Sequence, residues 1–373
     1  MDKILVVDRK LFVDGLLIGG SLSGKSKTLP ILDNVRIDIV GSCVDFSSNS
    51  IMSYITHSVA GCIKSKDFDG DYSFLVNHQD FLRSVKSLRD NEIEIVFLSN
   101  SLTIKHSRGS IELPIFDVTE FPTMDVVDDG RSFSIMTSKM FSWINTAKAF
   151  VATDELLPTL CGMYLYFDDD KVGYCATDTR RLVTDSYELE SFGGDGVSCI
   201  IPSVVLPTLQ GILSDSDMVR MRINEKNITF FTELSTLTCQ LQVGRYPNFR
   251  AVIPQENTNL VGVKKADIID SVNRVGMFTD KATSLIKMII GDEKITFVGA
   301  DDAYGRNATD ECTCTGDCEP LTIGVSAEML LQCINCIDSD DVLMAFSTPN
   351  RPILLNDALH PNKQMVLMPM IVN

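Results

Sequence analysis

The chain has 373 residues, and its 33 lysines and arginines against 50 aspartates and glutamates give a formal net charge of −17. This length predicts two or three domains, and a content of 45% hydrophobic and 22% charged residues excludes a disordered or fibrous chain. No apolar run reaches the ~18 residues of a membrane-spanning helix, and the first ten residues lack the charge order of a secretory signal, so we expect a cytoplasmic protein. The eleven cysteines argue against a disulfide framework, and the negative charge argues against a simple nucleic-acid binder.

The first third of the chain predicts two helices and several strands. Apolar residues at helical spacing predict one helix that begins near Lys10 and another that Asn77 caps. Runs rich in β-branched residues at 35–40 and 92–98 predict antiparallel strands, because such residues favour extended backbone. The apolar positions of the two helices are Phe12 and Leu16, then Phe81, Val85 and Leu88.

The same order of elements returns twice. In the middle third a helix begins near Ser138, Ser203 caps a second one, and residues 229–237 predict a strand. In the last third the helices begin at Ala266 and Ser326, and residues 286–298 and 342–346 predict strands. The apolar positions of these four helices are Met140, Ile144 and Ala147; Leu206, Leu209 and Leu213; Ile268, Val272 and Val275; Leu330, Ile334 and Ile337.

The spacing of these elements indicates a threefold internal repeat. The first helices begin at intervals of 128 residues, and the second helices at intervals of 126 and 123. Each repeat of about 125 residues predicts an α+β domain in which two helices pack on one face of an antiparallel sheet. We therefore predict three tandem domains, residues 1–127, 128–255 and 256–373, with borders in polar stretches.

The negative charge is not spread evenly over these elements. The six predicted helices together carry +4, which leaves −21 for the rest of the chain. Such a protein could turn its helices toward a polyanion and keep its acidic surface elsewhere. The alternative is that exposed helix faces simply carry some lysine and arginine.

One segment, from Gly19 to Ser26, fits the phosphate-binding pattern GxxxxGK[ST]. A phosphate-binding loop follows a strand and opens a helix, because the N–H groups at the helix start hold the phosphates. Here a predicted helix precedes the segment and a β-rich run follows it. We therefore interpret the segment as a flexible basic loop, and keep a nucleotide hydrolase as an alternative function.

The clustered cysteines near the end of the chain, Cys312, Cys314, Cys318, Cys333 and Cys336, suggest a zinc site at first sight. Structural zinc sites use paired ligands at short repeating gaps, and this cluster has neither that pattern nor a nearby histidine. The four histidines are far apart and have no neighbouring serine, cysteine or acid at a catalytic spacing. The sequence thus predicts no metal, no cofactor and no catalytic site.

Four segments, in their order and spacing, resemble the β subunit of bacterial DNA polymerase III, the sliding clamp. They are TLPILDN at 28–34, ATDTRRL at 176–182, GRYPNFR at 244–250 and VLMPM at 366–370. Three departures are visible: Thr179 and Arg180 stand where the family usually has Gly-His, Ile371 follows the methionine-rich tail where a basic residue is common, and Ala251 replaces a frequent basic residue.

The resemblance implies a head-to-tail homodimer whose six domains close a ring around double-stranded DNA. Its partners would be the catalytic subunit of DNA polymerase III, the clamp loader, and other replication and repair proteins with clamp-binding peptides, with no membrane involved. A ring held on DNA by topology needs no reading of base edges, and modest lysine and arginine density toward the phosphates suffices. The candidate DNA-facing residues are Lys25, Lys27, Arg83, Lys86, Lys139, Lys148 and Arg274.

The resemblance also implies an apolar cleft between the second and third domains that captures partner peptides. Leucine and methionine side chains would form an adaptable wall there. The cleft residues would be Leu160, Thr177, Arg181, Leu182, Pro247, Val252, Met329, Val366, Met368, Pro369 and Met370. At the dimer interface, Met277 and Phe278 would meet Ile111 and Leu113 of the second copy. A repeat-built scaffold that binds proteins but not DNA is a further alternative.

Overall fold

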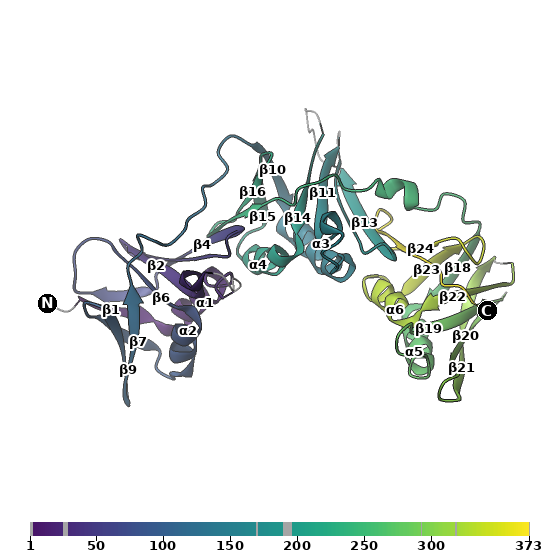
Figure 1. The fold of residues 1–373 in the computed structure, drawn as a ribbon, viewed down its shortest axis with the longest axis horizontal. Coiled ribbons are helices and arrows are strands. Elements are labelled where there is room, and N and C mark those ends of the chain that lie inside the picture. Colours follow the sequence, from purple (N-terminus) through teal and green to yellow (C-terminus); the bar gives the residue numbers. More distant parts are fainter. Residues whose placement is uncertain are drawn as a thin grey trace. The chain divides into compact units, whose positions relative to one another are not determined.

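The computed structural model describes residues 3–24, 29–168, 171–188, 196–291, 293–317 and 319–372 (Figure 1). The chain forms two compact units, one of residues 1–142 and 204–241 and the other of residues 143–203 and 242–373. The boundary between the units runs through the middle repeat, inside helix α3 (Thr137–Phe150). Each unit therefore contains one outer repeat and part of the middle one.

In the first unit, thirteen of the described strands form one antiparallel sheet, in the order β10-β15-β16-β17-β4-β3-β2-β6-β9-β8-β7-β1-β5. Helices α1 (Arg9–Gly19), α2 (His78–Ser87) and α4 (Leu206–Ile212) belong to this unit. The strands are β1 (Lys3–Asp8), β2 (Asn34–Val40), β3 (Cys43–Asn49), β4 (Ser53–Ala60), β5 (Ile63–Lys66), β6 (Tyr72–Asn77), β7 (Glu92–Phe97), β8 (Ser101–His106), β9 (Gly109–Phe116), β10 (Arg131–Met136), β15 (Met218–Ile223), β16 (Asn227–Phe231) and β17 (Ser235–Gln240).

In the second unit, twelve of the described strands form an antiparallel sheet in the order β14-β11-β12-β13-β25-β24-β23-β18-β21-β20-β19-β22. Helices α5 (Lys265–Gly276) and α6 (Ala327–Asn335) belong to this unit. The strands are β11 (Gly162–Asp168), β12 (Lys171–Thr177), β13 (Arg181–Glu188), β14 (Val197–Pro202), β18 (Asn259–Lys264), β19 (Leu285–Ile290), β20 (Lys294–Asp301), β21 (Arg306–Asp317), β22 (Leu321–Ser326), β23 (Asp341–Phe346), β24 (Ile353–Asp357) and β25 (Gln364–Leu367).

The predicted helices are present. The first helix of each repeat begins at Arg9, Thr137 and Lys265, again at intervals of 128 residues, and the apolar positions that predicted all six helices are buried. Asn77 caps α2 as predicted, because its side chain accepts from the backbone N–H of Asp80. Ser203 does not cap α4: it opens a short 3₁₀ turn, Ser203–Val205, and α4 follows without a side-chain cap.

Three of the predicted strands are single strands, and two are not. Residues 35–40, 92–98 and 342–346 lie almost entirely in β2, β7 and β23. Residues 229–237 were wrongly predicted as one strand, since they cover the hairpin of β16 and β17. The same holds for residues 286–298, which cover the hairpin of β19 and β20.

The glycines that suggested a phosphate-binding loop have a packing role. A Cβ atom on Gly19 would lie 2.4 Å from Phe46, and one on Gly20 would lie 2.2 Å from Nε2 of His78. Helix α1 therefore comes close to β3 and to the start of α2 only because these positions lack side chains. Phe12 of α1 meets the Phe46 ring edge-on at 5.1 Å, which anchors the helix on the sheet.

Candidate functional site

The candidate site lies in the second unit, where strand β13 of the middle repeat pairs with β25 of the last repeat. The register joins Leu182 to Val366 and Arg181 to Leu367. The pairing continues past the end of β25, because the backbone N–H of Met368 donates to the Arg180 carbonyl at 2.9 Å. Two distant motifs of the sequence, at 176–182 and 366–370, are thereby brought together.

An apolar cluster lies at this strand junction. It contains Leu160, Leu182 and Val366, which are 5%, 4% and 1% exposed, and it extends to Tyr246 and Phe249. The Tyr246 ring stacks on Tyr164 with centroids 4.5 Å apart, and burial raises the pKa of its hydroxyl far above the ordinary range. Three of the predicted cleft residues therefore lie together in one buried cluster.

Arg181 lies in the same place, but its side chain is buried and fully engaged. Its guanidinium donates to the Asp178 carboxylate at 3.0 Å, to the Ala149 carbonyl at 2.8 Å, and to Oε1 of Gln332 on α6. The guanidinium also lies 5.1 Å from the centre of the Phe150 ring. Arg181 thus ties the end of α3 and the β12–β13 turn to α6.

The turn before Arg181 is held by its own polar groups. The Thr177 hydroxyl donates to the Arg181 carbonyl at 2.6 Å, and Asp178 accepts from the backbone N–H groups of Arg180 and Arg181 at 3.0 and 2.8 Å. Thr179 has a φ of 78°, in the left-handed region that favours glycine, where the resembling family usually has that residue. The sequence prediction did not include Asp178 or Gln332 in the site. Gln332 could not be found by local spacing, because it is 151 residues from Arg181 along the chain.

Other predicted cleft residues lie at the surface of the unit. Val252 and Met368 are 46% and 38% exposed, Pro247 is exposed, and Met329 and Pro369 are half-buried. Two apolar residues that were not predicted, Leu156 at 86% and Val243 at 85% exposure, lie on the loops that carry Leu160 and Tyr246. Only their lack of helical or strand spacing in the sequence could have marked them. The apolar cluster is thus flanked in the chain by apolar side chains that reach solvent.

Met370 lines a separate pocket of about 350 Å³ in the same unit. Its backbone N–H donates to the Gly324 carbonyl at 2.8 Å, so the tail adds to the outer edge of β22. The pocket walls mix apolar and polar groups. They are formed by Lys287, Thr322, Gly324, Pro349, Asn350, Met370, Ile371 and Val372.

Of the predicted dimer-interface residues, Ile111 and Leu113 are half-buried, and Met277 and Phe278 are exposed. Ile111 and Leu113 of β9 pair with β8 on one side, and among the described residues β9 meets its other neighbour β6 only at Ile115 and Phe116. The other edge of the start of β9 is thus open within the described chain. In the second unit, Met277 and Phe278 follow α5 and are 68% and 37% exposed.

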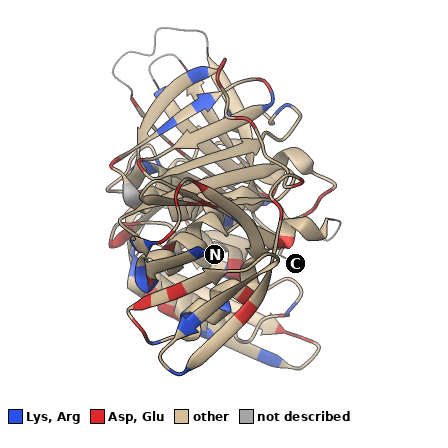
Figure 2. Cartoon of the chain, turned by 90° about the vertical axis from the view of Figure 1, so that its left-hand side faces the viewer, with Lys and Arg blue, Asp and Glu red and all other residues tan. Residues whose placement is uncertain are grey.

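The predicted DNA-facing residues fall into four groups. Arg83 and Lys86 are exposed on α2, whereas Lys139 and Lys148 lie on α3. Arg274 of α5 forms ion pairs with Asp310 and Asp270, so carboxylates accompany its charge. Lys25 and Lys27 lie outside the described residues. Figure 2 shows acidic and basic residues mixed along the strands.

The local structure argues against a nucleotide site at residues 19–26. Helix α1 ends at Gly19, and the next described elements are a short 3₁₀ turn, Pro30–Asp33, and strand β2. A phosphate-binding loop requires the reverse order, a strand before and a helix after. Lys25 and Ser26 themselves lie outside the described residues. The nucleotide hydrolase alternative therefore has no structural support.

Three of the five clustered cysteines are core residues, and Cys336 is half-buried. Cys312 and Cys314 are buried in β21 and Cys333 is buried in α6, while Cys318 lies outside the described residues. Burial raises the pKa of the Cys312 thiol to about 12, which disfavours the thiolate that binds metal ions.

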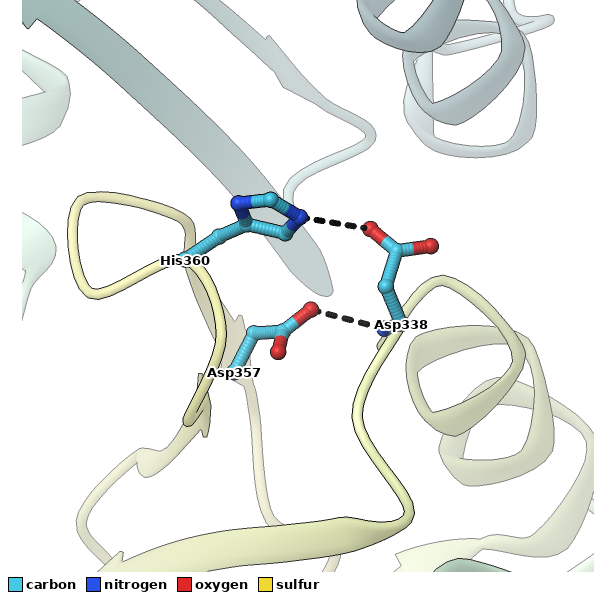
Figure 3. Close-up of side chains that lie close together, drawn as sticks. All are labelled: Asp338, Asp357 and His360. Atoms are coloured by element: carbon cyan, nitrogen blue, oxygen red, sulfur yellow. Dashed lines mark hydrogen bonds and ion pairs between the residues drawn. The ribbon is translucent and has the colours of Figure 1, made fainter.

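Within the described residues one group of three possible metal ligands occurs, Asp338, Asp357 and His360 (Figure 3). Asp338 accepts from the buried Lys363 ammonium at 2.9 Å and lies 3.6 Å from Nε2 of His360. Asp357 accepts from the backbone N–H groups of Asp338 and Leu359 at 2.7 and 3.0 Å. These contacts hold two loops together, and the lysine already supplies the positive charge.

Three repeats of two helices on an antiparallel sheet, joined strand to strand, define a protein of the DNA-clamp class. The family models of the DNA polymerase III beta subunit match nearly the whole chain: the N-terminal domain at residues 5–125, the central domain at 134–248 and the C-terminal domain at 250–371. The chain belongs to the DNA polymerase III beta subunit family, the bacterial sliding clamps.

Individual relatives agree with this assignment. The beta sliding clamp of Rickettsia felis is 23% identical over 387 residues, which cover 99% of each chain. A crystal structure of the sliding clamp from Pseudomonas aeruginosa bound to griselimycin superposes with a TM-score of 0.93 at 21% identity, over 100% of each chain. The corresponding clamp from Bartonella birtlesii gives a TM-score of 0.91 at 26% identity, also over 100% of each chain. In the described part of the chain, no helix has the length and apolarity needed to cross a bilayer.

Proposed function

We propose that two copies of this chain form a ring around double-stranded DNA and tether the replicative DNA polymerase to its template. The carrying observation is the match of all three domain models of the family, in order, along residues 5–371. In this proposal the protein works in the bacterial cytoplasm, has no catalytic site of its own, and consists of domains 1–127, 128–255 and 256–373. The clamp loader and other replication and repair proteins would be its further partners.

Open strand edges and exposed apolar residues support the homodimer. An unpaired edge such as that of β9 from Gly109 to Leu113 readily pairs with another chain. In the last repeat, Met277 and Phe278 are apolar residues that this chain leaves exposed. A head-to-tail dimer would cover both features of each copy, which is the closure that a symmetric ring requires.

The apolar surface beside the β13–β25 junction supports peptide capture. Buried Leu182 and Val366 supply a fixed floor, while Met368 and Val252 supply exposed side chains. Methionine adapts its shape to different partners, so one surface could accept several peptides. The pocket that Met370 lines would receive a further part of the same peptide.

The ring is tested by molar mass and by DNA synthesis. We expect about 82 kDa in solution, twice the 41.2 kDa of one chain, and longer products from the polymerase once the protein is loaded on primed circular DNA. A monomer that does not lengthen the products would instead favour the scaffold alternative. ATP affinity in the micromolar range that Lys25→Ala abolishes would favour the nucleotide hydrolase.

The peptide site is tested with two exposed methionines. Met368→Ser, beside β25, should weaken binding of a polymerase peptide at least tenfold, or about 1.4 kcal/mol. Met52→Ser is the matched control, because Met52 is 48% exposed beside the β4–β17 pairing and should not affect the peptide. Met370→Ala with removal of residues 371–373 should also weaken binding while the dimer persists. Fluorescence titration measures all three, and equal affinities for both methionine variants would contradict the site.

A further inference from the structure

The helices of this chain differ in charge from its first half to its second. Helices α1, α2 and α3 contain six lysines and arginines and two acids. Helices α4, α5 and α6 contain two basic residues, Lys265 and Arg274, and three acids, Asp267, Asp270 and Glu328. The surplus of positive charge on the helices therefore lies entirely in the first 150 residues.

In the described part of the chain, the two basic residues of helix α2 form no ion pair, and the one acid of the helix is the exposed Asp80 in its first turn. Arg83 and Lys86 are three residues apart, so they lie on one side of the helix, and both are exposed. Phe81 and Val85 are buried on the other side. Within the part of the chain that the structure describes, no carboxylate lies within ion-pair distance of Arg83 or Lys86. Both cations are thus available to an anion from solution.

Helix α5 presents the opposite arrangement. The Arg274 guanidinium binds the Asp310 carboxylate and lies 4.0 Å from the Asp270 carboxylate. Arg274 holds the pKa of Asp310 below its usual value, and the Ser271 hydroxyl and the Glu311 N–H donate to the same carboxylate. The other basic residue, Lys265, donates to the Ile337 carbonyl. One guanidinium between two carboxylates leaves a net negative group.

The rest of the last repeat follows the same pattern. Six of its lysines and arginines form ion pairs with aspartate or glutamate: Lys264, Arg274, Lys294, Arg306, Arg351 and Lys363. At each of these six residues, a phosphate would have to compete with a carboxylate that the fold already places beside the positive charge. This competition lowers the gain from a phosphate contact.

We propose that DNA inside this clamp gains more phosphate contacts from helix α2, through Arg83 and Lys86, than from helix α5, which contributes almost no phosphate binding. The proposal rests on the clamp function proposed above, and it adds that phosphate contacts are distributed unevenly between the helices. Each copy would offer the polyanion one basic helix face and one nearly neutral or acidic face. DNA in a ring of two copies would then meet a lining that is more positive at α2 than at α5, and not a uniformly positive one.

The test compares two double variants that each remove two positive charges from the full-length dimer. They are Arg83→Ala with Lys86→Ala, and Lys264→Ala with Arg274→Ala, where Lys264 directly precedes α5 and both residues form ion pairs. Binding of a fluorescent 30-base-pair duplex is followed by anisotropy between low and moderate salt. Each lost phosphate contact lowers the slope of log affinity against log salt by about 0.9. The first variant should therefore lose about 1.8 of the slope, and the second less than 0.5.

The outcomes separate the two proposals. A wild-type protein that is not retained on circular DNA after loading contradicts the clamp function itself. If the wild type is retained but both double variants give equal salt slopes, or the first variant shows no loss of slope, the uneven distribution of phosphate contacts is wrong while the clamp function stands. Arg83→Glu with Lys86→Glu serves as a second variant, expected to weaken binding further. Circular dichroism and molar mass confirm that each variant is a folded dimer.

Discussion

Strand β17 pairs with β4 through five residues in the first unit, and β13 pairs with β25 through four residues in the second. Both pairings join the middle repeat to an outer one, and both extend a sheet across the border between two repeats. The chemistry around them differs. At β4–β17, His57 binds the Ser235 hydroxyl at 2.7 Å, and beside it, between β16 and β17, Thr229 binds Thr238 at 2.9 Å, all buried.

The β13–β25 junction is held by a buried guanidinium and by apolar side chains. Arg181 reaches Asp178, Ala149 and Gln332, and Leu182 packs in a cluster that extends to aromatic rings. Exposed Met368 follows β25 directly. The comparison shows that strand pairing between repeats is surrounded mainly by buried polar contacts in one place and by a buried guanidinium and an apolar cluster in the other.

The largest effect is expected from Arg181→Ala. Removing the buried guanidinium takes a partner from the Asp178 carboxylate and the Gln332 amide, both half-buried, and from the Ala149 carbonyl, which should lower the free energy of unfolding by about 3 kcal/mol. Urea unfolding followed by the fluorescence of Trp143, the one tryptophan of the chain and a member of this unit, measures the loss. Arg181→Lys keeps the charge but not the planar set of donors, so we expect an intermediate value. A loss below 1 kcal/mol for alanine would show that the junction does not depend on this network.

A matched pair of leucines separates stability from binding. Leu182 and Leu237 are 4% and 0% exposed and pair with Val366 and Ile55 at the two junctions. Replacing either by alanine leaves a cavity and should cost about 3 kcal/mol, measured by calorimetry. Only Leu182→Ala should also weaken peptide binding in the fluorescence titration. Equal effects of both variants on the peptide would remove the functional difference between the junctions.

A smaller effect is expected from Ser235→Ala. The variant removes the hydroxyl that meets Nδ1 of His57 at 2.7 Å, and the loss of one buried hydrogen bond should cost about 1.5 kcal/mol. Thr236→Ala, at the half-buried neighbouring position, is the control and should change stability by less than 0.5 kcal/mol. Thermal unfolding at neutral pH compares the two variants. A neutral result for Ser235→Ala would mean that the polar contact is incidental to this junction.

The smallest effect is expected from Thr179→Gly, and its sign is stabilising. Thr179 has a φ of 78°, which costs a residue with a Cβ atom about 1–2 kcal/mol, while the added freedom of glycine in the unfolded chain offsets part of the gain. We therefore expect the free energy of unfolding to rise by about 0.5–1 kcal/mol, with unchanged peptide affinity. A decrease in stability would show that the threonine side chain contributes contacts that outweigh the backbone strain.

Helices and their order could be predicted from the sequence because each helix must bury one side on a sheet. Positions such as Phe81 and Val85 keep helical spacing, and all of them are buried. The hairpin at residues 229–237 could not be predicted, since its turn contains no glycine, proline or asparagine. The prediction that Ser203 caps a helix was wrong, because a 3₁₀ turn precedes α4 at this place.

The site was predictable only in part. Leu182, Val366 and Met368 belong to short motifs, and the strand pairing brings these motifs together as the family resemblance implies. The partners of charged residues were not predictable, because Gln332 is 151 residues from Arg181 and Asp310 is 36 residues from Arg274. Local spacing gives no information about such distant pairs. The sequence therefore predicted Arg274 as a cation available to DNA, whereas in the structure it forms ion pairs with Asp310 and Asp270.

The pairing of β4 with β17 also has a consequence for synthesis on the ribosome. The segment from Ser53 to His57 emerges about 180 residues before its partner strand, from Ser235 to Cys239, exists. During that interval β4 is an unpaired strand edge, which can pair with other chains. In a fragment that ends at residue 127, this edge of β4 would stay unpaired, because β17 is missing. We expect such a fragment to aggregate, whereas one ending after Leu241 would shield it.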